Sequence, residues 1–301
     1  MTQKNGIKIL DCTLRDGGYI NNWDFGTKAK DIVNLLQKAN IDFIEIGFIT
    51  KEKSEDNQTL FNDFNKIRNF LPENYDKNKI LGMIHYGEFP AEFVPDVKDS
   101  PIGGLRVIFK KEQKKDALEY CKSIKAKGYK LFINPTFTNL YSDNEFITFL
   151  KEAENLKPDA ISIVDSMGLM KENDVLHFFN LIQNNLNNDI SLCFHSHNNL
   201  QLSFANAQVL LKACKDRELA LDATLFGMGR GAGNLCTEII TQYINDNYNG
   251  DYKTEYILKL VNEQIMPIFK KSPWGYSVPY YFLRNAFQSK DIINYLGPFV
   301  L

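Results

Sequence analysis

The segment IKILDCTLRDGG, residues 7–18, begins as a short apolar run and ends in charged residues and two glycines. Residues 7–10 fit a β-strand, and Asp11, Arg15 and Asp16 follow it closely. Charged side chains at the end of a buried strand are costly unless a partner neutralises them. A metal ion, an anionic substrate or a plain Arg–Asp ion pair would each supply such a partner.

Short apolar runs of this kind recur along the chain. They are continuous rather than alternating, which is typical of parallel strands covered on both faces. The candidate strands are residues 7–12, 42–48, 80–85, 103–109, 129–134, 159–164, 190–195 and 219–225.

Helices are expected between these runs. Ser142 and Glu145 have the spacing of a capping box that opens a helix, and the other helical segments are 27–39, 58–70, 172–186, 200–215, 235–246 and 254–271. Eight βα units in about 250 residues predict a TIM (β/α)8 barrel, an α/β fold. An open doubly wound sheet is the alternative, but polar clusters after nearly every strand favour the barrel. We expect the barrel over residues 1–250 and a helical, aromatic-rich extension over 251–301.

The composition is that of an ordinary globular protein, with 44% hydrophobic residues, 24% charged residues and a net charge of −2. This charge indicates no general affinity for nucleic acid or for an anionic membrane. The sequence begins without a recognisable leader and has no long apolar run. The five cysteines form no CxxC pair, so a disulfide framework or a zinc ribbon is not expected. A cytoplasmic enzyme is the resulting expectation.

The two histidines at the end of one candidate strand are the sharpest functional signal. His195 and His197 are two positions apart, so both imidazoles leave the strand on the same side. Two imidazoles and a carboxylate from another strand form a metal site with open positions. Asp16 is the natural carboxylate, and Mn²⁺, Mg²⁺, Fe²⁺ or Zn²⁺ would suit the set. A hydrogen-bonded histidine pair without metal is the alternative.

Other polar residues are expected at the same end of the barrel. Glu45 should point into the interior, where Arg15 or Arg106 would pair with it. Asp165 ends a strand, and His85 ends another and lines the site in one interpretation. The glycine-rich loop 226–234 either forms a tight turn or binds a phosphate, and Asn234 at its end would reach a metal or a substrate oxygen.

Five motifs in this order resemble the DRE-TIM metallolyase (HMGL-like) superfamily, closest to its 4-hydroxy-2-oxovalerate aldolase branch. They are DCTLRDGG, IEIGF, IVDSMG, HSHNN and GMGRGAGN, and the resemblance covers about residues 7–246. It implies a divalent metal, Mn²⁺ or Mg²⁺ before Zn²⁺, held by Asp16, His195 and His197. It also implies that Asn234 is a further candidate ligand and that Arg15 stabilises an enolate oxygen.

Two positions depart from that branch. Tyr19 replaces the histidine that serves as base in those aldolases, and an unperturbed tyrosine has a pKa near 10, so Arg15 or the metal would have to lower it. His85, or a hydroxide held by the metal, is the alternative base. Arg230 replaces an alanine in the glycine-rich loop. It either adds a cation for a more acidic or phosphorylated substrate or points to solvent.

The resulting functional hypothesis is a metal-dependent aldolase or carbon–carbon lyase that acts through a pyruvate-type enolate, with Arg15, Tyr19 and His85 as catalytic residues. Substrate contacts are assigned to Arg15, Glu45, Asp165, Arg230 and Asn234. The alternatives are a Claisen-type acyl-CoA lyase or synthase on the same metal, and a barrel that binds a metabolite or partner without turnover. A small-molecule 2-oxo acid is the expected substrate. A homodimer and, by analogy with the aldolase branch, an aldehyde dehydrogenase are the expected protein partners.

Overall fold

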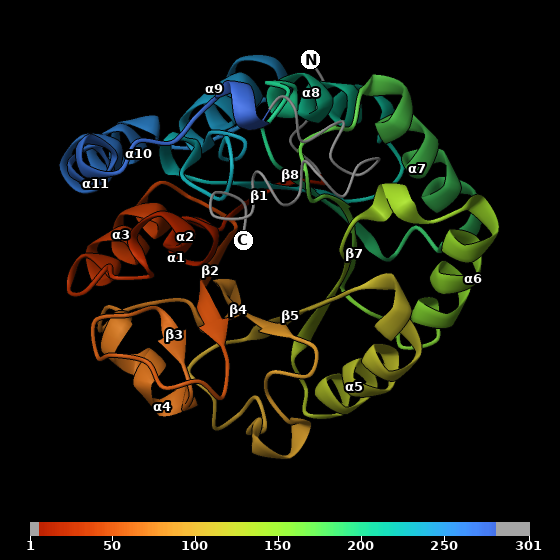
Figure 1. Ribbon diagram of the computed structural model, residues 1–301, viewed down its shortest axis with the longest axis horizontal. Coiled ribbons are helices and arrows are strands. Elements are labelled where there is room, and N and C mark those ends of the chain that lie inside the picture. The colour runs from red at the N-terminus through yellow and green to blue at the C-terminus, as the bar shows by residue number, and fades with distance from the viewer. Residues whose placement is uncertain (1–5, 281–301) are drawn as a thin grey trace.

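The computed structural model describes residues 6–280 and contains a closed barrel of eight parallel strands, surrounded by helices (Figure 1). The strands pair in chain order, and β1 pairs with both β2 and β9, which closes the ring. The barrel prediction is therefore confirmed, and every expected strand is present. The strands are β1 Ile7–Asp11, β2 Phe43–Ile49, β4 Ile80–His85, β5 Gly104–Phe109, β6 Lys130–Pro135, β7 Ala160–Asp165, β8 Ser191–Ser196 and β9 Leu219–Ala223.

The helices between the strands cover the outside of the barrel with one apolar face each. In α3, for example, Ile32, Val33 and Leu36 are fully buried. The capping box predicted before α6 is present, with the Ser142 amide donating to Glu145 Oε2 at 2.8 Å. The main helices are α3 Lys28–Lys38, α5 Lys114–Ala126, α6 Asp143–Glu154, α7 Glu172–Asn185, α8 Ser203–Ala213 and α9 Thr237–Tyr248.

Short helical turns occupy most of the remaining loops. Two of them, α1 Thr13–Asp16 and α2 Gly18–Asn21, follow β1 directly, and α1 carries Arg15 and Asp16 of the opening motif. Five further turns are the 3₁₀ turns η2 Lys77–Lys79, η3 Ala91–Phe93, η4 Lys111–Gln113, η5 Thr138–Leu140 and η6 Leu225–Gly227.

The helix predicted over residues 58–70 is wrong in its first part. The chain there forms a short strand, β3 Leu60–Phe61, followed by α4 Phe64–Ile67 and η1 Arg68–Phe70. β1 pairs with β2 at Phe43 and Ile44 and then ends at Asp11, so that edge of β2 needs another partner beyond Ile44. The residues around β3 provide it, because the Phe48 amide donates to the Thr59 carbonyl at 3.1 Å.

The extension after the barrel is helical, as expected, but is not one regular helix. It consists of α10 Thr254–Leu260, a π-helical turn η7 Val261–Ile265 and α11 Met266–Lys271. The wider turn precedes Pro267, which cannot donate a backbone hydrogen bond. α10 packs against α3 and α9 outside the ring (Figure 1). The expected aromatic tail is described only as far as residue 280.

No helix within residues 6–280 combines the length and apolar character that a bilayer-spanning segment needs.

Candidate active site

Arg15 and Asp16 lie at the carboxyl end of β1 because the chain turns at once into α1. Both side chains are buried, with 4% and 1% of their surface exposed. Asp11 fixes the turn, because its carboxylate accepts hydrogen bonds from the Thr13 amide at 3.0 Å and from the Thr237 hydroxyl at 2.7 Å. The two charged residues are thus held at the edge of the barrel where TIM-barrel active sites form.

Arg15 is paired with two carboxylates. Its Nε donates to Glu45 Oε2 at 2.6 Å, and its Nη1 lies 3.2 Å from Asp16 Oδ2. Burial alone would lower the Arg15 pKa, but the charges of Glu45 and Asp16 raise it well above its ordinary value. Burial would likewise raise the Asp16 pKa, yet Arg15 and the neighbouring histidines hold it well below its ordinary value. Both groups are therefore charged at neutral pH.

A second buried arginine continues this network across the barrel interior. Arg106 Nη1 lies 3.3 Å from Glu45 Oε1, and its Nη2 donates to Asp222 Oδ2 at 2.5 Å. Asp222 Oδ2 in turn lies 3.0 Å from His195 Nδ1. The expectation that Glu45 points inward and pairs with an arginine is confirmed, and both named arginines take part. The assignment of Glu45 as a substrate contact stays a prediction. Its two carboxylate oxygens face Arg15 and Arg106, which favours a role within the ion-pair network.

Asp222 was missed by the sequence analysis. It is a single carboxylate inside the apolar strand LALDA, and it is 1% exposed. An isolated acidic residue in a buried strand was the available signal, because such a group requires a buried partner. Its effect is to orient the imidazole of His195 from behind, as carboxylates do for metal-binding histidines.

Arg106→Met is expected to lower the free energy of unfolding by about 3–5 kcal/mol, because it leaves two buried carboxylates without their shared partner. Urea denaturation would measure the change. Arg68→Met is the matched control, because within residues 6–280 the Arg68 guanidinium donates only to the Asp99 carbonyl, at 3.3 Å on an exposed surface. A loss for Arg106→Met no larger than that of the control would show that the network does not stabilise the barrel.

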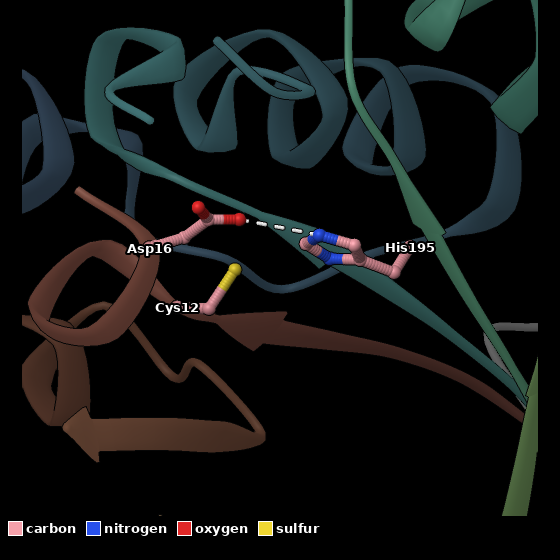
Figure 2. A group of neighbouring side chains, drawn as sticks. All are labelled: Cys12, Asp16 and His195. Carbon is pink, nitrogen blue, oxygen red and sulfur yellow. Dashed lines mark ion pairs between the residues drawn. The ribbon is translucent and has the colours of Figure 1, made fainter. Parts of the chain in front are cut away.

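The two histidines direct their Nε2 atoms toward Asp16. His195 Nε2 lies 3.2 Å from Asp16 Oδ2, which Figure 2 marks with a dashed line, and His197 Nε2 lies 4.0 Å from the same oxygen. The Nδ1 atoms are occupied elsewhere, by Asp222 and by the Arg230 carbonyl, the latter at 3.2 Å. These contacts place a proton on each Nδ1 and turn each Nε2 toward Asp16. Burial would lower the His195 pKa, but the contacts with Asp16 and Asp222 raise it, so a metal ion at Nε2 of His195 would displace a proton.

The donor set fits a divalent metal ion. Two donor atoms that are each about 2.1 Å from one ion lie roughly 3–4 Å apart, and the distances of 3.2 and 4.0 Å agree. Neither carboxylate oxygen of Asp16 accepts a hydrogen bond from the described residues. Burial lowers the pKa of His197 to about 4, so its imidazole is neutral at pH 7, as metal binding requires.

Cys12 is also close to this group. One ligand atom each of Cys12, Asp16 and His195 lies within 4.8 Å of the others, and Figure 2 shows the thiol beside the carboxylate. The Cys12 Sγ donates to the Ala223 carbonyl at 3.4 Å, and burial raises the pKa of the thiol well above its ordinary value. Because a metal binds the thiolate, we interpret Cys12 as a packing residue and His197 as the third candidate ligand.

The glycine-rich loop is shaped by close backbone packing. A Cβ at Gly229 would lie 2.1 Å from Asn234 Nδ2, and one at Gly233 would lie 2.1 Å from the Gly227 carbonyl oxygen. These approaches favour the tight-turn interpretation over a phosphate site. Asn234 keeps a buried Oδ1 with no hydrogen-bond partner among residues 6–280, so it remains a candidate further ligand.

Tyr19 lies at the mouth of the barrel with 44% of its surface exposed. Its ring packs edge-on against Trp23, with 4.8 Å between ring centroids. The pKa of its phenol is raised, first by desolvation and then by the charge of Asp16, while Arg15 opposes the shift. The condition for Tyr19 to act as a base, a lowered pKa, is therefore not met by the described residues.

His85 ends β4, with its Nδ1 4.0 Å from Glu88 Oε1. Burial, and then the charges of Lys110 and Arg15, lower its pKa below 6.5. The imidazole is therefore neutral at pH 7 and able to accept a proton.

The Asp165 carboxylate binds the backbone of the loop that follows β7. Its Oδ1 and Oδ2 accept hydrogen bonds from the Leu169 and Met170 amides at 2.9 and 3.1 Å. Burial nevertheless raises its pKa to about 6. Its assignment as a substrate contact stays a prediction, and these contacts favour a structural role.

The HMGL-like family model matches residues 108–262, and the chain belongs to this family. An oxaloacetate decarboxylase of Mycobacterium tuberculosis is 25% identical over 238 residues, which are 77% of this chain and 68% of that protein. A 4-hydroxy-2-oxovalerate aldolase of Geobacillus genomosp. 3 is 24% identical over 246 residues, 80% of this chain and 71% of that protein.

Two solved structures extend the comparison. The N-terminal domain of a candidate aldolase from Bacteroides vulgatus superposes with a TM-score of 0.77 at 25% identity, covering 96% of each chain. The HMG-CoA lyase of Bacillus subtilis, 14% identical, has a TM-score of 0.70 over 96% of this chain and 100% of that one, and shows the shared fold. With aldolases and a decarboxylase as relatives, the chain is a carbon–carbon lyase of the HMGL-like family.

Proposed function

We propose that the chain is a divalent-metal-dependent aldolase that cleaves a 2-oxo acid through a pyruvate-type enolate. The observation that carries this proposal is the position of the buried Arg15 guanidinium, with its Nη1 3.2 Å from the Asp16 carboxylate toward which two imidazoles point. This arrangement concentrates positive charge beside a metal-type donor set. An enolate needs both features.

In the proposed cleavage, a base removes the proton of the C4 hydroxyl and the C3–C4 bond breaks. The electron pair of that bond forms the enolate across C2 and C3, and the aldehyde leaves. A proton then returns to C3 and gives pyruvate. Arg15 supports the step that develops charge. Its Nε and Nη1 face carboxylates, and the contacts among residues 6–280 leave Nη2 for the enolate oxygen.

Asp16, His195 and His197 would hold the metal, with Mn²⁺ or Mg²⁺ favoured and Zn²⁺ as the alternative. The bound ion would supply Lewis-acid polarisation of the substrate keto group. The chain's own contribution is to fix the tautomers of both histidines through Asp222 and the Arg230 carbonyl, so that the ligand atoms are set before any ion arrives.

His85 is the proposed base for the hydroxyl proton, because a lowered pKa keeps it neutral at pH 7. The rate of 4-hydroxy-2-oxovalerate cleavage should be constant near neutrality and fall as the pH drops below 6.5 through the pKa of His85. In His85→Gln the rate at pH 7.5 should fall about 100-fold. The fall in rate below pH 6.5, the acidic limb of the pH profile, should be absent in this variant. An unchanged limb in the variant would assign the proton transfer to another group.

The experiment that tests the proposed function is deuterium exchange at C3 of pyruvate, followed by NMR with and without Mn²⁺. Metal-dependent exchange is the expected result. Absence of exchange with the metal shown to be bound would exclude a pyruvate aldolase. The Claisen-type acyl-CoA lyase and the non-catalytic barrel would then be the remaining interpretations.

The expected homodimer, aldehyde dehydrogenase partner and cytoplasmic location stay predictions within this proposal. The tail that motivated the homodimer lies largely outside the described residues. Its first part packs on the barrel, since the Trp274 indole donates to the Phe226 carbonyl at 3.0 Å.

A further inference from the structure

Arg230, in the glycine-rich loop after β9, is a half-buried cation whose guanidinium has no partner among the described residues 6–280. Among residues 6–280, no carboxylate lies within 4.0 Å of it and no carbonyl accepts from it. The other arginines in this part of the chain all have such partners. Arg15 and Arg106 pair with carboxylates, Arg68 donates to one carbonyl, and Arg217 donates to several.

Arg230 faces the active-site mouth. Its Cζ lies 6.0 Å from the centroid of the Tyr19 ring, and its own carbonyl accepts from His197 Nδ1. Its positive charge opposes the rise of the Tyr19 pKa and adds to the lowering of the His197 pKa. The guanidinium is therefore close enough to the candidate metal ligands to act on a bound substrate, and the solvent-facing alternative is not favoured.

The charge at the mouth is asymmetric. Glu88 and Glu52, in the loops after β4 and β2, are close enough to each other that Glu52 contributes to raising the Glu88 pKa, after burial. Glu88 also acts on Tyr19. Tyr19 thus feels both the positive charge of Arg230 and the negative charge of Glu88. An asymmetric mouth of this kind would orient a substrate whose far end carries negative charge.

We propose that Arg230 binds a second anionic group of the substrate, a carboxylate or a phosphate carried by the aldehyde half. This assignment rests on the proposed function, in which Arg15 and the metal ligands hold the 2-oxo acid half. The substrate class is then a 4-hydroxy-2-oxo acid with an anionic group beyond C4. Cleavage of the C3–C4 bond leaves that group on the departing aldehyde, and Arg230 holds it by paired N–H donors, which suit both carboxylate and phosphate.

The test is aldol addition of pyruvate to three aldehydes: succinic semialdehyde, glyceraldehyde 3-phosphate and the neutral butyraldehyde. The expected kcat/KM of the wild type is at least about 10-fold higher for one anionic aldehyde than for the neutral one. The preferred anion distinguishes carboxylate from phosphate. Arg230→Met should remove most of that preference, Arg230→Lys should retain part of it, and Arg68→Met should leave it unchanged.

Failure of this assignment is distinguishable from failure of the proposed function. If pyruvate exchanges deuterium but the three aldehydes react with equal kcat/KM, the aldolase stands and the role of Arg230 is overturned. If no exchange occurs, calorimetric titration with oxaloacetate and pyruvate tests Arg230 alone. Tighter binding of the dianion that is lost in Arg230→Met would support the anion site, and equal affinities in the wild type would overturn it.

Discussion

Asp16→Asn is expected to lower the affinity for Mn²⁺ by at least about 100-fold, since even groups that only orient metal ligands cost 10–100-fold when removed. The carboxylate is the only anionic donor in the set with His195 and His197. Both of its oxygens are buried and accept no hydrogen bond from residues 6–280, although Arg15 Nη1 lies 3.2 Å from Oδ2 as an ion-pair partner. An amide in its place is neutral and has one oxygen instead of two. Pyruvate exchange should fall with the affinity, by roughly 1,000-fold at limiting metal.

Calorimetric titration with Mn²⁺ would measure the affinity, and NMR would follow the exchange. Asp42→Asn is the matched control, because Asp42 is a partly buried carboxylate that precedes β2, at the opposite end of the barrel. There it accepts from the Ile9 amide at 3.0 Å and the Tyr252 hydroxyl at 2.6 Å. If Asp16→Asn changed only the stability of the chain and left the Mn²⁺ affinity intact, Asp16 would be the structural ion partner of Arg15 and not a metal ligand.

The barrel was predictable because each strand carries its own signal. Strands buried on both faces must be apolar throughout, so continuous runs such as AISIVD in β7 mark them without knowledge of their neighbours. β3 had no such signal, because it is two residues long and forms only on the edge of β2 that β1 leaves free. A strand whose cause lies in another strand cannot be found from local composition.

The candidate site divides in the same way. Asp16, His195 and His197 were predictable because their residue types and their places at strand ends are local features. The ion-pair network behind them was only partly predictable. Arg106 pairs with Asp222, which is 116 positions away in the sequence, and only the closed barrel brings the two together. The rise of the Tyr19 pKa could not be predicted from the sequence either, because it depends on the desolvation of the phenol and on the nearby Asp16 carboxylate.

Arg15→Met is expected to lower kcat for pyruvate exchange by about 100- to 1,000-fold, the usual cost of removing one donor to a developing oxyanion. The loss should appear in kcat more than in KM, because the negative charge on the enolate oxygen exists only after the proton has left C3. Metal affinity should persist, since Arg15 is not a ligand. Arg15→Lys keeps the charge but loses the paired donors, so its kcat should lie between those of the wild type and Arg15→Met.

A stability measurement must accompany these rates, because Arg15 also neutralises buried carboxylates. Removing Arg15 leaves Glu45 paired with Arg106 alone, and it removes the guanidinium that lies 3.2 Å from Asp16. The free energy of unfolding should fall by about 3–5 kcal/mol, the usual cost of an uncompensated buried charge. Bound Mn²⁺ would offset part of that cost at Asp16. A folded, metal-loaded Arg15→Met with the kcat of the wild type would restrict Arg15 to the ion-pair network and exclude it from the chemistry.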